Sequence, residues 1–593
     1  NLHQLCVLNS RSKHECPTIW GVRRSEAAAT SRSVSRRNFL RTAAVTSGTV
    51  GAGFAAQAWA QSSQPAPSAS PLAEPELPPL PFVHGVASGD PLPDSVVLWT
   101  RVTPDDAAWP GSGGGAPTPV RWDVATDPEF LTIVQHGESL SHPDADHTVH
   151  IDVHGLAADS VYFYRFVVTD GPHAGATSPT GRTKTAPAPG APVKRQRWAV
   201  ASCANYEAGF FSAYADMAER GWAGDIDLTV FLGDYIYEYA QYGYSGFGPV
   251  RLHHPAHEIV SLADYRTRYG RYRTDQALKN AHAAMPWIVV WDDHEVANNN
   301  WRDGADNHDP SEGDFYARRD AAIRAYYEWM PVRTTQTSTE GHIYRTFTFG
   351  DLVELTVMDL RTYRDVEFWR GGSRQPGDAR TMLGSEQYNW LISTLERSKT
   401  KWNALGNSVM FSPMRLGTVM QNPATRPIAK ALSSNILSSQ ADIPAIDELP
   451  LNGDQWDGYD SERRRLLDAL GRLGKNPIFL TGDIHTEWSH TIPYGDTQIG
   501  CEVVCSSITA PNVTDSLGLP AGHPLMRTAT GYMFAANPNL RHCALDTHGY
   551  TIVTIADADV FMEWLRVDDI LAPLSPVRTA AMLNWRKGVG FTA

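Results

Sequence analysis

Side chains of the kinds that can bind metal ions follow four separate apolar runs in this sequence. The four segments are Ser202-Cys203, Gly233-Asp234-Tyr235-Ile236-Tyr237, Asp292-Asp293-His294-Glu295 and Gly482-Asp483-Ile484-His485. Carboxylate oxygens suit calcium, magnesium or manganese, and imidazole suits iron and zinc. Each apolar run predicts a buried strand, and in α/β sheets sites are assembled at the carboxyl ends of the strands. The sequence therefore predicts a metal site at such an edge.

The segment around Asp234 has the composition of a bridging site. Gly233 allows a tight turn where the strand ends, and the two oxygens of Asp234 could bridge two ions ~3.5–4 Å apart. Tyr237 follows three residues later, and its phenolate would favour a hard ion such as ferric iron. Taken alone, the segment fits an Asp cap beside a core Tyr equally well.

The other three segments support the same interpretation. Asp292 and Asp293 are adjacent carboxylates, which repel one another unless cations or hydrogen bonds separate them. Asp483 and His485 alternate along an extended segment and can point at one site. Cys203 has a simpler alternative, a buried and inert thiol. Its place after a strand is what favours a ligand role.

Two arginines follow another predicted strand, in the segment Asp359-Leu360-Arg361-Thr362-Tyr363-Arg364. A guanidinium presents a planar fork of donors that matches phosphate oxygens, so Arg361 or Arg364 could hold a substrate or stabilise a transition state. The alternative is a surface ion pair with Asp359 or Asp365.

The elements that must position these residues form an α/β domain, predicted for residues 194–593. Apolar strands alternate there with amphipathic helices, which indicates a layered architecture. The predicted strands are residues 198–201, 228–232, 287–291, 353–358 and 478–481. The predicted helices are residues 264–285, 314–329, 384–399 and 461–473.

A different pattern precedes this domain. Residues 82–184 alternate short strands with Pro, Gly and Asp clusters, which predicts a small antiparallel β-sandwich of the immunoglobulin or fibronectin type III kind. The Pro-rich residues 185–193 are the expected linker. A chain of 593 residues with net charge −14 is long enough for two domains, and its acidity argues against stable nucleic-acid binding.

Residues 1–60 are typical of an export leader. Ser35-Arg36-Arg37-Asn38-Phe39-Leu40-Arg41 is a twin-arginine signal, and Ala58-Trp59-Ala60 is a predicted cleavage site. A Ser/Pro-rich linker follows at residues 61–81. We expect export through the twin-arginine translocase to the periplasm or the medium, with no membrane helix after the leader. The even number of remaining cysteines (Cys203, Cys501, Cys505, Cys543) would permit two disulfides.

Together these motifs resemble the PhoD-type alkaline phosphatases of the metallophosphoesterase superfamily. The resemblance includes the segment Phe82-Val83-His84-Gly85-Val86-Ala87-Ser88-Gly89-Asp90-Pro91 and the run Gly233–Tyr239. It implies a four-layer α/β sandwich after the β-sandwich domain. It also implies ferric iron on Cys203, Asp234, Tyr237 and His485. Calcium would bind Asp234, Asp483 and either Asp293 or Asn299, and zinc or manganese remain alternatives for the metals.

The expected activity is hydrolysis of phosphate monoesters and diesters at alkaline pH by metal-activated water. His294, Arg361 and Arg364 are the candidate catalytic residues beside the metals. Substrates would be small phosphate esters, including nucleotides and phospholipid headgroups. The alternatives are a dedicated phosphodiesterase or phospholipase D-like enzyme of the same family, and a non-catalytic phosphate- or glycan-binding protein.

Overall fold

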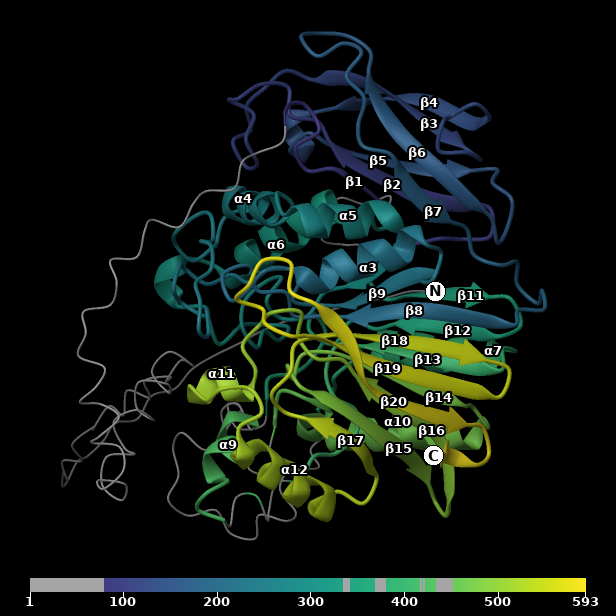
Figure 1. Ribbon diagram of the computed structural model, residues 1–593, viewed down its shortest axis with the longest axis vertical. Coiled ribbons are helices and arrows are strands. Elements are labelled where there is room, and N and C mark those ends of the chain that lie inside the picture. Colours follow the sequence, from purple (N-terminus) through teal and green to yellow (C-terminus); the bar gives the residue numbers. More distant parts are fainter. Residues whose placement is uncertain are drawn as a thin grey trace, which may run out of the picture.

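The computed structural model describes residues 79–333, 342–367, 380–415, 419, 422–432 and 452–592. Two mixed β-sheets pack face to face, and helices cover the outer face of each sheet. A smaller four-stranded sheet forms one end of the molecule, shown at the top of Figure 1. The four-layer α/β sandwich preceded by a β-sandwich is therefore confirmed.

The first sheet has ten strands with a parallel centre. In order across the sheet they are β21 (Gly590–Thr592), β20 (Val577–Arg586), β19 (Asp559–Val567), β18 (Gly549–Ala556), β8 (Arg195–Ala201), β9 (Leu228–Leu232), β10 (Trp287–Val290), β1 (Val86–Gly89), β2 (Ser95–Arg101) and β5 (Thr148–His154). Strands β8, β9 and β10 are parallel. Every residue of β9 and β10 is buried, as expected for parallel strands that are covered on both faces.

The second sheet has seven strands. They are β11 (Arg345–Phe349), β12 (Val353–Val357), β13 (Trp402–Asn407), β14 (Pro477–Thr481), β16 (Thr497–Val504), β15 (Glu487–Tyr494) and β17 (Leu540–Ala544). Strands β12, β13, β14 and β16 are parallel. Successive side chains of β14 alternate between two cores: Ile478 and Leu480 pack between the sheets, and Phe479 packs against the outer helices.

Helices cover both sheets and one end of the second. Those on the first sheet are α3 (Ser212–Trp222), α4 (Leu262–Tyr272), α5 (Gln276–Ala284) and α6 (Phe315–Trp329). Those on the second are α7 (Gly384–Arg397) and α10 (Asp460–Arg472). Helices α9 (Arg426–Leu432), α11 (Val513–Leu517) and α12 (Pro524–Ala536) share a separate apolar cluster with β15, β16 and β17. Short 3-10 helices span Pro143–Ala145, Pro310–Glu312 and Trp456–Tyr459.

The single helix predicted over residues 264–285 is wrong, because the structure has two helices there. Helix α4 begins with a capping box of Ser261 and Asp264 and ends at Tyr272. Asp275 then caps α5, because its side chain accepts a hydrogen bond of 2.8 Å from the backbone amide of Leu278. The apolar periodicity continues across the break, but α4 ends with Arg273 as its C-cap and Asp275 caps the start of α5.

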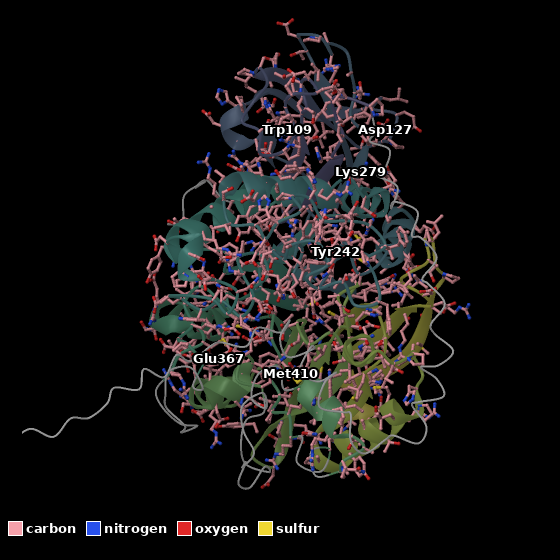
Figure 2. The ribbon with its side chains drawn as sticks, turned by 90° about the vertical axis from the view of Figure 1, so that its left-hand side faces the viewer. Trp109, Asp127, Tyr242, Lys279, Glu367 and Met410 are labelled. Carbon is pink, nitrogen blue, oxygen red and sulfur yellow. The ribbon has the colours of Figure 1, made fainter. Side chains whose placement is uncertain are left out.

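The predicted N-terminal sandwich is present, but one of its sheets extends into the rest of the molecule. Strands β3 (Thr118–Ala125), β4 (Ile133–Ser141), β6 (Val161–Val168) and β7 (Gly181–Lys184) form the four-stranded sheet. They share a buried apolar cluster with β2 and β5. Strand β1 pairs in parallel with β10 at Gly89 and Trp287, so β1, β2 and β5 continue the ten-stranded sheet. In Figure 2, Trp109 and Asp127 lie in the sandwich, and Lys279 lies where α5 meets it.

Several predictions concern other parts of the chain. The twin-arginine motif, the cleavage site and most of the Ser/Pro-rich linker lie outside the described residues. Among the helices that the structure describes, none has the length and apolar character needed to cross a bilayer. Cys203, Cys501, Cys505 and Cys543 are all free, so the disulfides that their even number permitted are not formed.

Candidate metal centre

The predicted ligands meet at the carboxyl edge of both sheets, each in a loop that follows a parallel strand. Three groups of ligand atoms form there, and within each group all atoms lie within 4.8 Å of one another. The groups are Cys203, Asp234 and His485; Asp234, Asp293 and His294; and Asp234, Asp292, Asp293 and Asp483. Asp234 belongs to all three groups, which is the arrangement that a bridging carboxylate requires.

The backbone of these loops is left-handed at the ligand positions. The φ angles are 61° at Cys203, 57° at Asp234, 53° at Asn299, 62° at Asp483 and 58° at His485. Residues other than Gly seldom adopt this conformation, and it costs of order 1–3 kcal/mol at each position. Five of the predicted ligands therefore occupy strained positions, as is common at functional sites.

Gly233 allows two of these loops to approach each other. Its φ is +96°, and a Cβ atom there would lie 2.4 Å from Cβ of Asp292 and 2.5 Å from its backbone nitrogen. Any side chain at this position would push the end of β9 away from the end of β10. The glycine before Asp234 is thus required by close packing as well as by the turn.

Asp234, Tyr237 and Cys203 form a buried group of titratable side chains. The Tyr237 hydroxyl donates a 2.9 Å hydrogen bond to Oδ2 of Asp234, and all three side chains are buried. Burial, reinforced by the charge of Asp234, raises the pKa of the Cys203 thiol and of the Tyr237 hydroxyl well above their usual values. Burial also raises the pKa of Asp234. A bound cation would reverse these shifts, because it stabilises the thiolate, phenolate and carboxylate forms.

His485 is oriented by a backbone carbonyl. Its Nδ1 lies 2.9 Å from the carbonyl oxygen of Pro511, and its Nε2 lies 3.3 Å from the Tyr237 hydroxyl and 4.0 Å from Oδ2 of Asp234. A hydrogen bond from Nδ1 to the carbonyl leaves Nε2 as the atom available for a metal, which is the usual arrangement of a metal-binding histidine.

Asp293 and Asn299 offer different atoms to the second part of the site. Asp293 contributes a carboxylate to two of the three ligand groups, and its Oδ2 accepts a 2.6 Å hydrogen bond from the backbone amide of Asn299. The side-chain nitrogen of Asn299 donates to Oδ2 of Asp306 at 3.0 Å. Asn299 therefore has its amide oxygen, and not its nitrogen, to offer to a cation.

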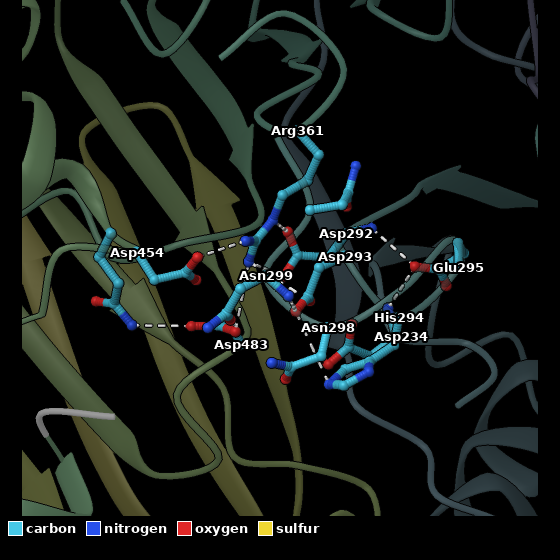
Figure 3. A network of polar contacts seen from close by, with 12 residues as sticks. Asp234, Asp292, Asp293, His294, Glu295, Asn298, Asn299, Arg361, Asp454 and Asp483 are labelled. Atoms are coloured by element: carbon cyan, nitrogen blue, oxygen red, sulfur yellow. Dashed lines mark hydrogen bonds and ion pairs between the residues drawn. The ribbon is translucent and has the colours of Figure 1, made fainter. Parts of the chain in front are cut away.

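Arg361 lies beside the acidic residues at the centre of Figure 3. Its Nε and Nη2 bind the two oxygens of Asp292 at 2.5 and 2.9 Å, and its Nη1 binds Asp454 at 2.8 Å. Nη2 also lies 3.5 Å from Asp293 and 3.7 Å from Asp483. Burial raises the pKa of Asp292 to about 7 despite this arginine. Arg361 thus pairs with Asp292 while it borders the ligand carboxylates.

Arg364 is also buried, and it contacts Asp454 and Asn300 instead of the ligand carboxylates. Its Nε donates to the carbonyl of Asn300 at 2.9 Å, and its two terminal nitrogens donate to the carbonyl and the carboxylate of Asp454 at 2.8 and 2.7 Å. The structure does not bring its guanidinium into any of the ligand groups. Neither arginine forms the surface ion pair with Asp359 or Asp365 that was the alternative.

His294 is paired with a buried carboxylate. Its Nδ1 lies 2.6 Å from Oε2 of Glu238, and its Nε2 lies 3.9 Å from Oδ2 of Asp293. Burial alone would lower the pKa of His294, but the charges of Asp293, Glu238 and Asp234 outweigh burial and raise the pKa to about 10. This imidazole can therefore hold a proton on Nε2, on the side of the ligand carboxylates.

Glu295 fastens two of the strand-end loops together. Its carboxylate accepts hydrogen bonds from the backbone amides of Asp234, Tyr235 and Asp292 at 3.0, 2.5 and 2.8 Å. The side chain is 2% exposed. A carboxylate with three backbone donors is well satisfied without a metal, so Glu295 supports the ligands and is not one of them.

The residues present fit a pair of cations. Oδ1 of Asp234 is buried and has no hydrogen-bond partner among the described residues, and the same holds for the amide oxygens of Asn298 and Asn300. Buried acceptors of this kind are costly unless a partner satisfies them. Thiol, phenol, imidazole and carboxylate donors around Asp234 make a cation the natural partner.

Sequence reasoning missed three residues of this site, Glu238, Asp454 and Gln455. Glu238 lies in the run after β9, and its glutamate next to Tyr237 was a usable signal. Asp454 gave no signal, because it is 93 residues from Arg361 in sequence and follows no apolar strand. Gln455, which donates to Oδ2 of Asp483 at 2.9 Å, was missed for the same reason.

Comparisons with known proteins agree with this geometry. The family model described as PhoD-like phosphatase matches residues 198–564, and the model described as PhoD-like phosphatase, N-terminal domain, matches residues 66–187. Alkaline phosphatase D of Bacillus subtilis (strain 168) is 37% identical over 537 residues, which is 87% of this chain and 82% of the relative. A solved structure of PhoD superposes with a TM-score of 0.73 at 35% identity and covers 88% of this chain and 93% of that one.

Proposed function

The chain belongs to the PhoD-like phosphatase family of phosphoric ester hydrolases, and we propose that it is an exported, metal-dependent enzyme that hydrolyses phosphate monoesters and diesters at alkaline pH. The observation that carries this proposal is the set of three ligand groups that share Asp234. Asp234 would thus help to hold two cations, which would supply the chemistry of dinuclear phosphoester hydrolysis.

The donor chemistry supports ferric iron at one position and calcium at the other. Cys203, Tyr237 and His485 would hold iron together with Asp234, because thiolate, phenolate and imidazole lie on that side. Asp483, Asp293 and Asn299 present oxygen ligands, which suit calcium; the imidazole of His294 lies beside them. Zinc or manganese would be compatible with the same carboxylates and imidazole.

When bound, these ions would supply positive charge to the phosphoryl oxygens and activate water. His294 would protonate the oxygen of the leaving alcohol from Nε2, with Glu238 holding the ring through Nδ1. Arg361 borders the ligand carboxylates and would stabilise negative charge on the phosphoryl group. Arg364 would act through Asp454, which it shares with Arg361.

Export is the part of the proposal that rests on the leader alone. The twin-arginine motif at residues 35–41 and the cleavage motif at residues 58–60 support passage through the twin-arginine translocase to the periplasm or the medium. That route carries folded proteins, which suits an enzyme that loads its metals before export. Fractionation of cells that express the full chain, beside an Arg36→Lys, Arg37→Lys double variant, tests it.

Metal analysis of the purified protein tests the chemistry. Plasma mass spectrometry should find iron and calcium at one or more per chain, and a phenolate-to-iron band should appear in the visible spectrum. Tyr237→Phe should remove the band. Tyr235→Phe is the matched control, because its hydroxyl faces His282 at 2.9 Å, and it should leave the band in place. Zinc or manganese without the band would overturn the iron assignment, and a folded protein that binds no metal would overturn the proposal.

A further inference from the structure

Two tyrosines extend the metal centre toward the surface. The rings of Tyr237 and His294 are buried and lie 4.2 Å apart between centroids. Tyr244 lies 5.7 Å from the Tyr237 ring, and Tyr239 lies 5.5 Å from the His294 ring and 5.4 Å from the Tyr244 ring. Tyr239 and Tyr244 are partly exposed. They are thus the outer layer of an aromatic stack whose inner layer belongs to the site.

The loop that carries these tyrosines is anchored to the segment that follows Cys203. The side-chain amide of Asn205 donates a 2.6 Å hydrogen bond to the carbonyl of Tyr244. Glu207 accepts hydrogen bonds from the backbone amides of Tyr242 and His253, at 2.9 and 3.0 Å. Asn205 and Glu207 are fully buried. The rings therefore keep a fixed position relative to the metal ligands, although they lie on a surface loop.

The position of Tyr244 is not explained by a role in orienting His485. Its hydroxyl lies 3.3 Å from Nδ1 of His485, but that nitrogen already has the carbonyl of Pro511 at 2.9 Å. The next residues of the loop, Ser245 to Phe247, line a cavity of about 460 Å3 together with Pro511. Tyr244 thus directly precedes residues that line this cavity, and its own ring lies 6.3 Å from the ring of His485 between centroids.

We propose that Tyr239 and Tyr244 bind the alcohol part of the ester, and that they favour a planar alcohol, such as a phenol or a nucleoside, over an aliphatic one. This inference rests on the proposed function of the same site. Cations bind the phosphoryl group whatever the alcohol is, so discrimination between esters must come from the alcohol side. Partly exposed aromatic faces interact with planar rings beyond simple area burial, by an amount that corresponds to about tenfold in affinity.

The test compares two monoesters, phenyl phosphate and glycerol 1-phosphate, on the metal-loaded full chain. Tyr244→Leu and Tyr239→Leu keep apolar bulk and remove the ring. Each variant should lower kcat/KM for phenyl phosphate about tenfold, mainly by raising KM. For glycerol 1-phosphate, kcat/KM should change less than threefold. Inhibition by inorganic phosphate should stay the same. The control Tyr242→Leu, at a residue that is 64% exposed on the same loop, should behave as the wild type.

Two results would overturn the inference. Equal losses on both esters, with weaker inhibition by phosphate, would mean that the tyrosines support the metal centre. Unchanged kinetics on both esters would mean that the rings do not contact the substrate. A wild-type protein that is loaded with metal and hydrolyses neither ester would instead remove the proposed function, and this inference with it, before any variant is compared.

Discussion

The N-terminal sandwich and the carboxyl edge of the two large sheets are both built from strands and short loops, but they bury different kinds of side chain. In the sandwich, Val120, Val124, Phe166 and Val168 point inward and share one apolar cluster. At the carboxyl edge, Asp234, Asp292, Asp293, His294 and Arg361 are almost fully buried and charged or titratable. Burial of apolar surface stabilises the first region, whereas burial of charge destabilises the second unless partners or cations compensate.

The difference shows that one molecule separates its sources of stability from its chemistry. None of the ligand groups found among the described residues includes a residue of the sandwich, whereas every one of them draws on the strand-end loops. Substitutions in the two regions should therefore have opposite signatures. In the sandwich, stability should fall and activity should not change; at the edge, activity should fall without a loss of stability.

Asp234→Asn should give the largest effect. It removes the charge of the carboxylate common to all three ligand groups, so kcat/KM should fall about a thousandfold or more. The thermal midpoint of the metal-free protein should stay the same or rise, because a buried charge is removed. Phosphatase assays and calorimetry measure the two quantities. Asp557→Asn, at a carboxylate that is 75% exposed, is the control; activity retained by Asp234→Asn would remove the bridging role.

Phe166→Ala should have the opposite signature. The side chain is fully buried in β6, and its removal should lower the free energy of unfolding by about 3–5 kcal/mol. The kcat of the folded fraction should not change. Urea unfolding beside a phosphatase assay checks this, with Phe561→Ala, 43% exposed, as the matched control. A fall in kcat would show that the sandwich affects the site through the β1–β10 junction.

Glu295→Gln should separate support of the site from metal binding itself. The variant replaces one of the two oxygens that accept three backbone hydrogen bonds by a donor. The loops of Asp234 and Asp292 should then shift, and metal affinity should fall about 10- to 100-fold. Titration of the metal-free protein with each metal measures this. Unchanged affinity would mean that the loops hold their positions without Glu295.

His84→Gln should have the smallest effect, which is on the pH dependence of the free energy of unfolding. Burial, then the positive charges of Arg101, Lys279 and Arg273, lower the pKa of His84 well below its usual value. Below pH ~6.5 His84 is protonated in the unfolded chain but stays neutral in the folded chain. The free energy of unfolding therefore falls as pH falls, by up to about 1.4 kcal/mol per pH unit. The variant should lose that part of the slope.

Urea midpoints at pH 7.5 and 5.5 measure the slope for the wild type and for His84→Gln. An equal difference between the two midpoints in both proteins would mean that His84 does not take part in acid destabilisation. The phosphatase activity of the folded variant at pH 7.5 should be unchanged. The variant would then show that a change outside the metal centre can alter stability without altering activity.

The strands, the layers and the meeting of most candidate ligands at one edge could be predicted from the sequence, because each depends on local pattern. Apolar runs that end in Cys203, Asp234 and His485 were enough to place these residues at one edge. The break before Asp275 could not be predicted, since the apolar period continues through it and only the caps at Arg273 and Asp275 mark the two helix ends. Asp454 depends on contacts between distant segments, and so does the continuation of β1 onto β10.

The left-handed backbone at the ligands has a consequence for laboratory evolution. Cys203 and His485 have φ angles of 61° and 58°, and glycine adopts that conformation without strain. Glycine at His485, the less buried of the two, would relieve that strain while it removes a candidate ligand. A screen that rewards heat resistance alone gives no protection to such a residue, so a library of this enzyme has to be selected for turnover and heat resistance together.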